Sequence, residues 1–270
     1  MLRFLFWNQR RQDLSDVVAE AASTLRPDIF VFCETGASSA RTLAALRVVG
    51  KYHFTTGRIG KRFHVFTRFH NRYIQVRREA ERYLIFEVAL PARDRFLLMV
   101  LHGPSKSVGW TPTSLAMEIS HYAGALRHAE AELKLSRSVI VGDFNMNPFE
   151  PGMVGAGAFN AVMDARQARK GKCVVQRREY RYLYNPMWNL LGDRTPGPPA
   201  SLFYNGNTHD ELLWHMVDQV IVSPEMIDYL DVASLRILDS IGGIVLTTPQ
   251  GRPRSAKFSD HLPIYFELTV

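Results

Sequence analysis

The sequence has few of the features that mark membrane proteins, disulfide-rich proteins or zinc-thiolate sites. Its 270 residues include two cysteines, Cys33 and Cys173, and no zinc-type spacing of Cys and His occurs. No apolar run approaches the ~18 residues that a membrane span requires, and the apolar start MLRFLFWN is too short for a signal peptide. Cys33 lies in the apolar run DIFVFCE, so we expect a buried thiol. These absences predict a soluble protein of the reducing cytoplasm.

Basic side chains outnumber acidic ones in this chain. Lys and Arg total 33 against 26 Asp and Glu, which gives a net charge of +7 and an isoelectric point near 9.5. Such an excess favours an anionic partner, either nucleic acid or a phosphate-bearing surface, although solubility alone would also explain it. With 46% hydrophobic residues the chain can fill one large core, so we expect a single domain over residues 1–270.

Hydrophobic periodicity predicts a mixed α/β fold. Amphipathic patterns indicate helices over residues 13–25, 38–47 and 113–135. Apolar runs between turn residues indicate strands over residues 2–7, 28–34, 64–69, 73–77, 82–90, 95–102, 138–145, 216–223, 232–238 and 261–268. A Gly- and Pro-rich loop is expected over residues 185–212. The short turns favour mostly antiparallel strands, in two sheets with helices outside.

Polar residues stand at or beside the ends of these buried strands. They are Asn8, Glu34, His102, Asp143, Asn145, Asp218, Asp260 and His261. A polar group beside a buried strand costs free energy unless it is satisfied, and strand ends and loops are where sites are normally built. We therefore expect these side chains to share one polar cleft.

The run GDFN raises a local question about two of these residues. Asp143 and Asn145 would face the same way if the extended chain continued through Phe144. Gly, Asp and Asn are also common turn residues, so a simple turn is the alternative.

The side-chain chemistry of the expected cleft suits hydrolysis of a phosphate ester. Asn8 and Glu34 offer hard oxygen ligands for Mg²⁺ or Mn²⁺, and Asp260 could complete or support that shell. His261 can accept a proton from water if a carboxylate holds its ring in the right tautomer.

The remaining groups could serve the water and the phosphate. Asp143 can orient the attacking water, and Asn145 can donate to the developing negative charge. His102 can donate to a phosphoryl oxygen.

Six motifs, in order along the chain, resemble those of the DNase I-like endonuclease/exonuclease/phosphatase superfamily: FWN, FCE, LH, GDFN, VDQVIVS and SDHLPI. The resemblance runs from residue 4 to residue 268, and GDFN followed much later by SDH is its most specific part. It implies a four-layered α/β sandwich of two mostly antiparallel sheets with helices outside. It also implies that Asn8, Glu34 and Asp260 belong to the metal shell and that Asp218 pairs with His261.

The chain departs from the pattern of many relatives at three places. Gln9 and Arg10 follow Asn8, where a small residue or an acid is common. The loop GPSKS after His102 is unlike the usual run, and the residues before Asp218 are not the frequent arginine. These departures leave open which branch of the superfamily, and therefore which substrate, the chain matches.

Two basic stretches add to the case for an anionic polymer. Residues 58–82 interleave arginines with aromatic residues, and residues 166–181 are also rich in Arg and Lys. We expect Arg68, Arg72 and Arg78 to contact substrate, since arginine clamps phosphates and stacks on bases. Strand alternation, with aromatics inward and arginines outward, predicts the same pattern without any such role.

The leading interpretation is a divalent-metal-dependent phosphodiesterase with a nucleic acid as substrate, that is, a nuclease. A phosphatase or phospholipase-type phosphodiesterase acting on a small or lipid phosphate is the alternative. A non-catalytic binding module is disfavoured because a competent residue occupies every expected catalytic position.

Overall fold

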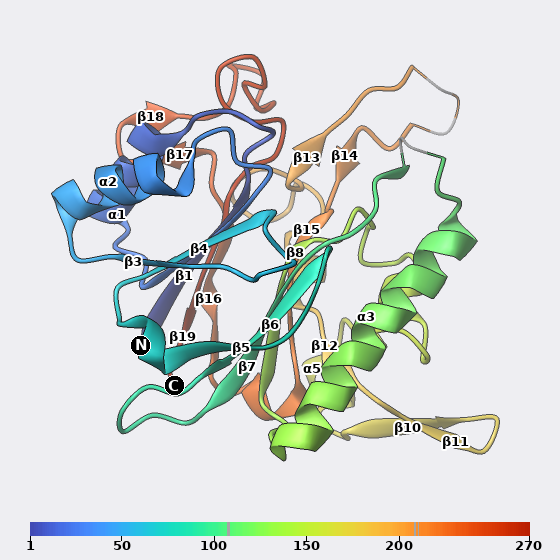
Figure 1. The fold of residues 1–270 in the computed structure, drawn as a ribbon. Coiled ribbons are helices and arrows are strands. Elements are labelled where there is room, and N and C mark those ends of the chain that lie inside the picture. The colour runs from blue at the N-terminus through green and yellow to red at the C-terminus, as the bar shows by residue number, and fades with distance from the viewer. Residues whose placement is uncertain (107–108, 208, 210) are drawn as a thin grey trace.

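The computed structural model describes residues 1–106, 109–207, 209 and 211–270, and two β-sheets dominate it (Figure 1). The strands of the first sheet are β1 (Leu2–Asn8), β2 (Ile29–Cys33), β3 (His53–Thr55), β4 (Phe63–Thr67), β16 (Leu230–Ile237) and β19 (Ile264–Leu268). The strands of the second are β5 (Ile74–Ala80), β6 (Tyr83–Val88), β7 (Phe96–His102), β8 (Ser138–Asp143), β9 (Ala161–Val162), β12 (Leu183–Tyr184) and β15 (Asp218–Val222).

Helices and small hairpins surround the two sheets. The helices are α1 (Ser15–Thr24), α2 (Ser39–Val49), α3 (Pro112–Leu133), α4 (Pro151–Val154) and α5 (Ala165–Ala168), with 3-10 turns η1 (Asn71–Tyr73), η3 (Pro186–Leu190) and η4 (Pro224–Met226). The hairpins are β10 (Lys172–Val175) with β11 (Arg178–Arg181), β13 (Leu202–Phe203) with β14 (Trp214–His215), and β17 (Ser240–Ile241) with β18 (Ile244–Val245).

The order of strands is β16-β19-β1-β2-β4-β3 in the first sheet and β5-β6-β7-β8-β15-β12-β9 in the second. Neighbouring strands are antiparallel except in the pairs β1–β2, β7–β8 and β9–β12. Helices α1 and α2 lie over the first sheet, and α3 lies over the second (Figure 1). The predicted four-layered sandwich of two mostly antiparallel sheets is therefore confirmed.

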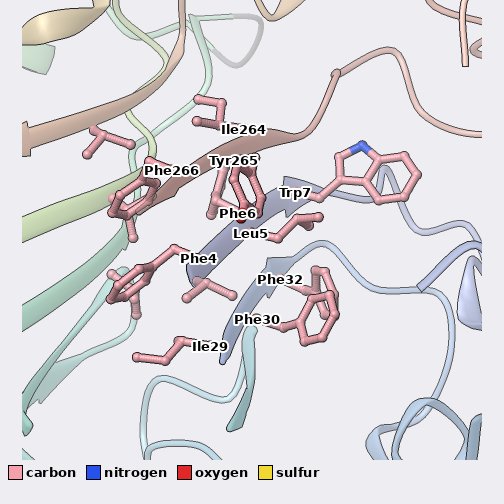
Figure 2. Close-up of a cluster of buried hydrophobic side chains, with 14 of the residues drawn as sticks. Phe4, Leu5, Phe6, Trp7, Ile29, Phe30, Phe32, Ile264, Tyr265 and Phe266 are labelled. Carbon is pink, nitrogen blue, oxygen red and sulfur yellow. The ribbon is translucent and has the colours of Figure 1, made fainter. Parts of the chain in front are cut away.

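Successive side chains of β1 and β2 point to opposite faces of the sheet and so fill two interior layers of the fold. Phe4 stacks on Phe266 of β19, with ring centroids 4.6 Å apart, while Phe30 on the other face contacts Tyr52 next to α2 (Figure 2). In the second sheet, Val141 joins the cluster that contains Phe4, whereas Ile140 belongs to the separate cluster under α3. Because both faces of these strands are covered, each strand reads as a continuous apolar run.

The expected loop over residues 185–212 is wrong in part. It contains η3 and β13, and several of its residues are joined to the body of the fold. Residues 208 and 210 of the expected loop lie outside the described residues. The Asn185 amide donates to Gln219 at 2.7 Å, and the Ser201 carbonyl accepts from the Leu262 amide at 2.7 Å. Gly and Pro correctly indicated irregular chain, but these partners lie far away in the sequence.

The expectations about thiols and membrane spans can also be compared with the structure. Cys33 is unpaired and fully buried, and burial raises the pKa of its thiol well above the ordinary value. Cys173 is unpaired and half-buried. Within the described ranges, no helix combines the length and apolarity needed to cross a lipid bilayer.

Candidate active site

The ends of five strands meet at one side of the sandwich. In the second sheet, Asp143 ends β8 and lies between His102 of β7 and Asp218 of β15 in the strand register. In the first sheet, Asn8 ends β1 and Glu34 follows β2. The Asn8 amide donates to Asp143 Oδ2 at 2.9 Å, which ties the two sheets together at this edge.

A cleft of about 600 Å³ opens over these strand ends. Seven of the eight sequence-predicted site residues line it: Asn8, Glu34, His102, Asp143, Asn145, Asp260 and His261. The eighth, Asp218, is fully buried directly behind His261. The structure therefore brings all eight polar residues together, and their individual roles remain proposals.

His261 and Asp218 form a buried pair. His261 Nδ1 lies 2.7 Å from Asp218 Oδ2, so Nδ1 carries the proton that is donated to the carboxylate. Nε2 is the ring nitrogen that is not engaged with Asp218. Burial disfavours the charged imidazole, but the carboxylates of Asp218, Asp143 and Asp260 together outweigh it and raise the pKa of His261 to about 10. The geometry is that of a base held in one tautomer by its partner.

Distant segments fix this pair in place. The Asp218 amide donates to Ser201 Oγ at 3.1 Å, and Leu202 forms a β-bridge with His261. The Trp7 indole donates to the His261 carbonyl at 2.8 Å. Ser259 Oγ accepts from the His261 amide at 3.1 Å. Sequence reasoning missed Ser201 because no local pattern marks it.

The GDFN run is both a turn and part of the cleft. Asn145 has a φ of +53°, and its amide donates to Asp143 Oδ1 at 2.8 Å. The extended chain therefore ends at Asp143, and the alternative, a turn, is what forms. Phe144 turns into the core under α3, where it meets Phe159 edge to face at 5.6 Å. The tight turn nevertheless leaves both Asp143 and Asn145 lining the cleft.

The cleft is rich in oxygen donors that suit a hard divalent cation. Glu34 Oε1 lies 3.3 Å from His102 Nε2, and Asp260 Oδ2 lies 3.2 Å from Arg10 Nε. Asp260 Oδ1 and Asp218 Oδ1 are buried, and neither has a hydrogen-bond partner within the described ranges. Ligand atoms of Asp143, Asp218 and His261 also lie within 4.8 Å of one another. The carboxylate oxygens among these atoms form a donor set that fits Mg²⁺ or Mn²⁺.

The three arginines expected to contact substrate lie on different segments outside the cleft. Arg68 follows β4 at the end of the sheet opposite Glu34 and lies 3.8 Å from Asp28. The Arg72 guanidinium stacks on the Tyr73 ring at 4.6 Å, and Arg78 pairs with Glu132 of α3 at 2.8 Å. None of the three lines the cleft. Spacing in the sequence did not reveal which end or face of its strand each occupies.

Several residues that line the cleft were not expected from the sequence. They are Arg10, Ser105, Lys106, Leu202, Tyr204, Glu211, His215 and Val217. Most belong to the loop after His102 and to the segment around β13 and β14. The departures from the family pattern at Arg10, in GPSKS and before Asp218 were sequence signals for part of this wall.

Comparisons with solved structures identify proteins of similar fold. The endonuclease domain of TRAS1, a telomere-specific non-LTR retrotransposon, superposes with a TM-score of 0.56 at 14% identity, covering 100% of this chain and 99% of that domain. An AP endonuclease from Archaeoglobus fulgidus gives 0.55 at 15% identity with full coverage of both chains. A 3′ phosphatase from Neisseria bound to a DNA hairpin gives 0.53 at 15%, covering 99% of each chain.

These structural matches establish the fold alone, because each identity is low. No curated protein matches the sequence at a significant level. The sequence profile of the Endonuclease/Exonuclease/phosphatase family matches residues 2–261, nearly the whole chain. The chain therefore belongs to the endonuclease/exonuclease/phosphatase family.

Proposed function

We propose that the protein is a divalent-metal-dependent phosphodiesterase that hydrolyses nucleic-acid phosphodiester bonds. The observation that carries this proposal is the buried His261–Asp218 pair, 2.7 Å apart, beside a cluster of carboxylates in an open cleft. A base oriented in this way can take a proton from water, and the oxygen donors around it suit Mg²⁺ or Mn²⁺.

In this mechanism His261 Nε2 accepts the proton of the attacking water while Asp218 holds the ring and remains a carboxylate. Asp143 orients the water, and Asn145 and His102 donate to phosphate oxygens as negative charge develops. Asn8, Glu34 and Asp260 would hold the divalent cation. When bound, that cation would offset the carboxylates that raise the pKa of His261 and would polarise the phosphate.

A second cavity supports a polymeric substrate over a small one. It has a volume of about 590 Å³ and adjoins the cleft, because Glu34 and His102 line both. Arg11, Lys61 and Arg62 line its wall with positive charge, although Arg62 also pairs with Glu81. A neighbouring phosphate of a nucleic-acid strand would meet these charges, whereas an isolated phosphate ester confined to the carboxylates would not.

The alternative is a phosphatase or phospholipase-type phosphodiesterase that acts on a small or lipid phosphate. The similarity in fold to a 3′ phosphatase from Neisseria supports keeping phosphatase activity as a candidate.

The deciding experiment is an activity screen of purified protein with Mg²⁺ and with Mn²⁺. It covers single- and double-stranded DNA, RNA, inositol phosphates and sphingomyelin, with His261→Ala as the inactive control. Cleavage of nucleic acid by the wild type alone would support the nuclease. Hydrolysis of only a small or lipid phosphate would replace it with the alternative.

A further inference from the structure

Arg10 lines the cleft together with Asn8, Glu34 and Asp260, the residues proposed to hold the divalent cation. Its Nε lies 3.2 Å from Asp260 Oδ2, and its Nη1 donates to the Ser255 carbonyl at 3.4 Å. The side chain is 49% exposed, so the guanidinium is held by Asp260 and is still accessible from the cleft that it lines.

The backbone holds Arg10 there in an unfavourable conformation. Arg10 and Arg11 have φ angles of +46° and +58°, a left-handed region that is sterically unfavourable for any residue but glycine. The Arg10 amide donates to Asn8 Oδ1 at 3.0 Å, and the Arg11 amide donates to the Glu34 carbonyl at 2.5 Å. Glu34 has a positive φ as well, so strain is concentrated where these two loops meet. Strain of this kind persists where the surrounding structure over-determines it, often at functional sites.

The two loops can meet because Gly36 has no side chain. A Cβ at Gly36 would lie 2.2 Å from the Arg11 carbonyl oxygen. The position of Arg10 therefore depends on contacts with the loop that carries Glu34, one of the expected metal ligands.

Arg10 and Lys106 both line the cleft, but they pair with different carboxylates. Lys106 already pairs with Glu150, with Nζ 2.5 Å from Oε1. Arg10 instead pairs with Asp260, whose other oxygen, Oδ1, is buried without a hydrogen-bond partner within the described ranges. A divalent cation held by Oδ1 of Asp260 would offset the charge of this carboxylate and weaken its pairing with Arg10 through Oδ2. The guanidinium could then turn from Asp260 into the cleft.

We propose that Arg10 is a further catalytic residue that changes partner from Asp260 to a non-bridging oxygen of the substrate phosphate. This inference rests on the proposed function. A guanidinium presents a planar set of donors that matches phosphate oxygens, and it keeps its charge at any working pH. Positive charge placed against the phosphoryl group stabilises the charge that develops in the transition state.

The test compares Arg10→Ala and Arg10→Lys with the wild type. Arg26→Ala is the matched control, because Arg26 is also exposed with a positive φ of +54° and does not line the cleft. The first measurement is calorimetric titration with Mn²⁺ alone. Arg10→Ala should bind Mn²⁺ about 2- to 5-fold more tightly, the ratio expected when an exposed ion pair no longer competes for Asp260.

The second measurement is the binding of inorganic phosphate to the Mn²⁺-loaded protein. Arg10→Ala should weaken it by about 10-fold or more, because a charge-assisted hydrogen bond is lost. The third is kcat on a small aryl phosphodiester, which should fall by about 10²–10³-fold in Arg10→Ala and less in Arg10→Lys, which keeps the charge but lacks the fork. Arg26→Ala should match the wild type in all three.

The inference is overturned if Arg10→Ala tightens Mn²⁺ binding but leaves phosphate binding and kcat unchanged, because Arg10 would then only neutralise Asp260. It is overturned equally if none of the three quantities changes. Failure of the proposed function has a different signature: a His261→Ala variant as active as the wild type. In that case the Mn²⁺ and phosphate titrations still report directly on the exchange of partners by Arg10.

Discussion

The floor and the rim of the cleft are built from different parts of the chain. The floor consists of Asn8, Asp143, Asp218 and His261, which lie at or beside strand ends and are at most 9% exposed. The rim consists of Arg10 and Tyr204 of the cleft and of Arg11, Lys61 and Arg62 of the adjoining cavity. All five lie on loops, and all are exposed except Arg62, which is half-buried. Floor residues are hydrogen-bonded to one another and to the core, so their geometry changes little with the loops.

This difference separates chemistry from substrate choice. Buried groups in fixed positions suit proton transfer and cation binding, which tolerate little misplacement. Exposed charges on loops suit contacts with a variable substrate. We therefore expect substitutions in the floor to abolish turnover on every substrate, and substitutions in the rim to change binding according to the substrate.

Removal of divalent cations should have the largest effect. The oxygen donors of the floor and of Glu34 carry negative charge that a cation must offset, so excess chelator should abolish hydrolysis of nucleic acid and of a small diester alike. Addition of Mg²⁺ or Mn²⁺ should restore it. Full activity after metal-free dialysis and in excess chelator would falsify the metal assignment.

The next largest effect is expected from His261→Ala. Loss of the base should lower kcat by about 10²–10⁴-fold on any substrate. His121→Ala is a matched control, since His121 is exposed on α3. Rates on a small aryl phosphodiester should be measured beside thermal unfolding, to show that the fold persists. Near-normal turnover of His261→Ala would remove this residue from the mechanism.

Asp218→Asn should cause a loss close to that of His261→Ala. If the new amide presents its NH₂ group to His261 Nδ1, the ring must carry its proton on Nε2, which removes the base. The substitution also replaces the buried carboxylate that accepts a hydrogen bond from His261 with a neutral amide. The check is kcat against pH for both proteins. An Asp218→Asn enzyme with an unchanged profile would show that the pair has no catalytic role.

Rim charges should give the smallest effect, and one that depends on the substrate. Binding of duplex DNA should fall with salt at a log–log slope of roughly −0.9 per contacted phosphate, and of single strands at about −0.7. A variant with Arg11, Lys61 and Arg62 changed to Ala should flatten that slope and leave hydrolysis of a small diester almost unchanged.

The control for the rim variant is the triple substitution of Arg68, Arg72 and Arg78, which keeps the same change in net charge. Because these arginines lie outside the cleft, each engaged with a neighbouring side chain, we expect a slope close to that of the wild type. A flatter slope in this control than in the rim variant would reverse the assignment and return the substrate track to the arginine-rich strands.

Much of the floor could be predicted from the sequence because strand ends are locally encoded. Continuous apolar runs defined β1, β2 and β8, and the polar residue that follows each run had to lie at a sheet edge. The motif order then identified Asp218 and Asp260, which local chemistry alone left open. Strand ends shifted by a few residues, as in β19, which begins at Ile264 rather than at residue 261.

The rim could not be predicted in the same way. Arg68 and Arg62 look alike in the sequence, yet the antiparallel pairing of β2 with β4 puts the first at the far end of the sheet and the second beside Glu34. The contact of Ser201 with Asp218 joins two segments that no periodicity relates. The direction of Phe144 depended on a space under α3 that only the packed helix provides.

The amino-acid sequence by itself determined which segments become buried strands and which polar groups end them, since both follow from short-range alternation and from the cost of burying unsatisfied polar atoms. Only the tertiary structure decided that Asp218 lies behind His261, that Arg10 faces Asp260, and which basic residues surround the cleft. These arrangements depend on strand pairing and loop closure between residues far apart in the chain, which local sequence patterns do not encode.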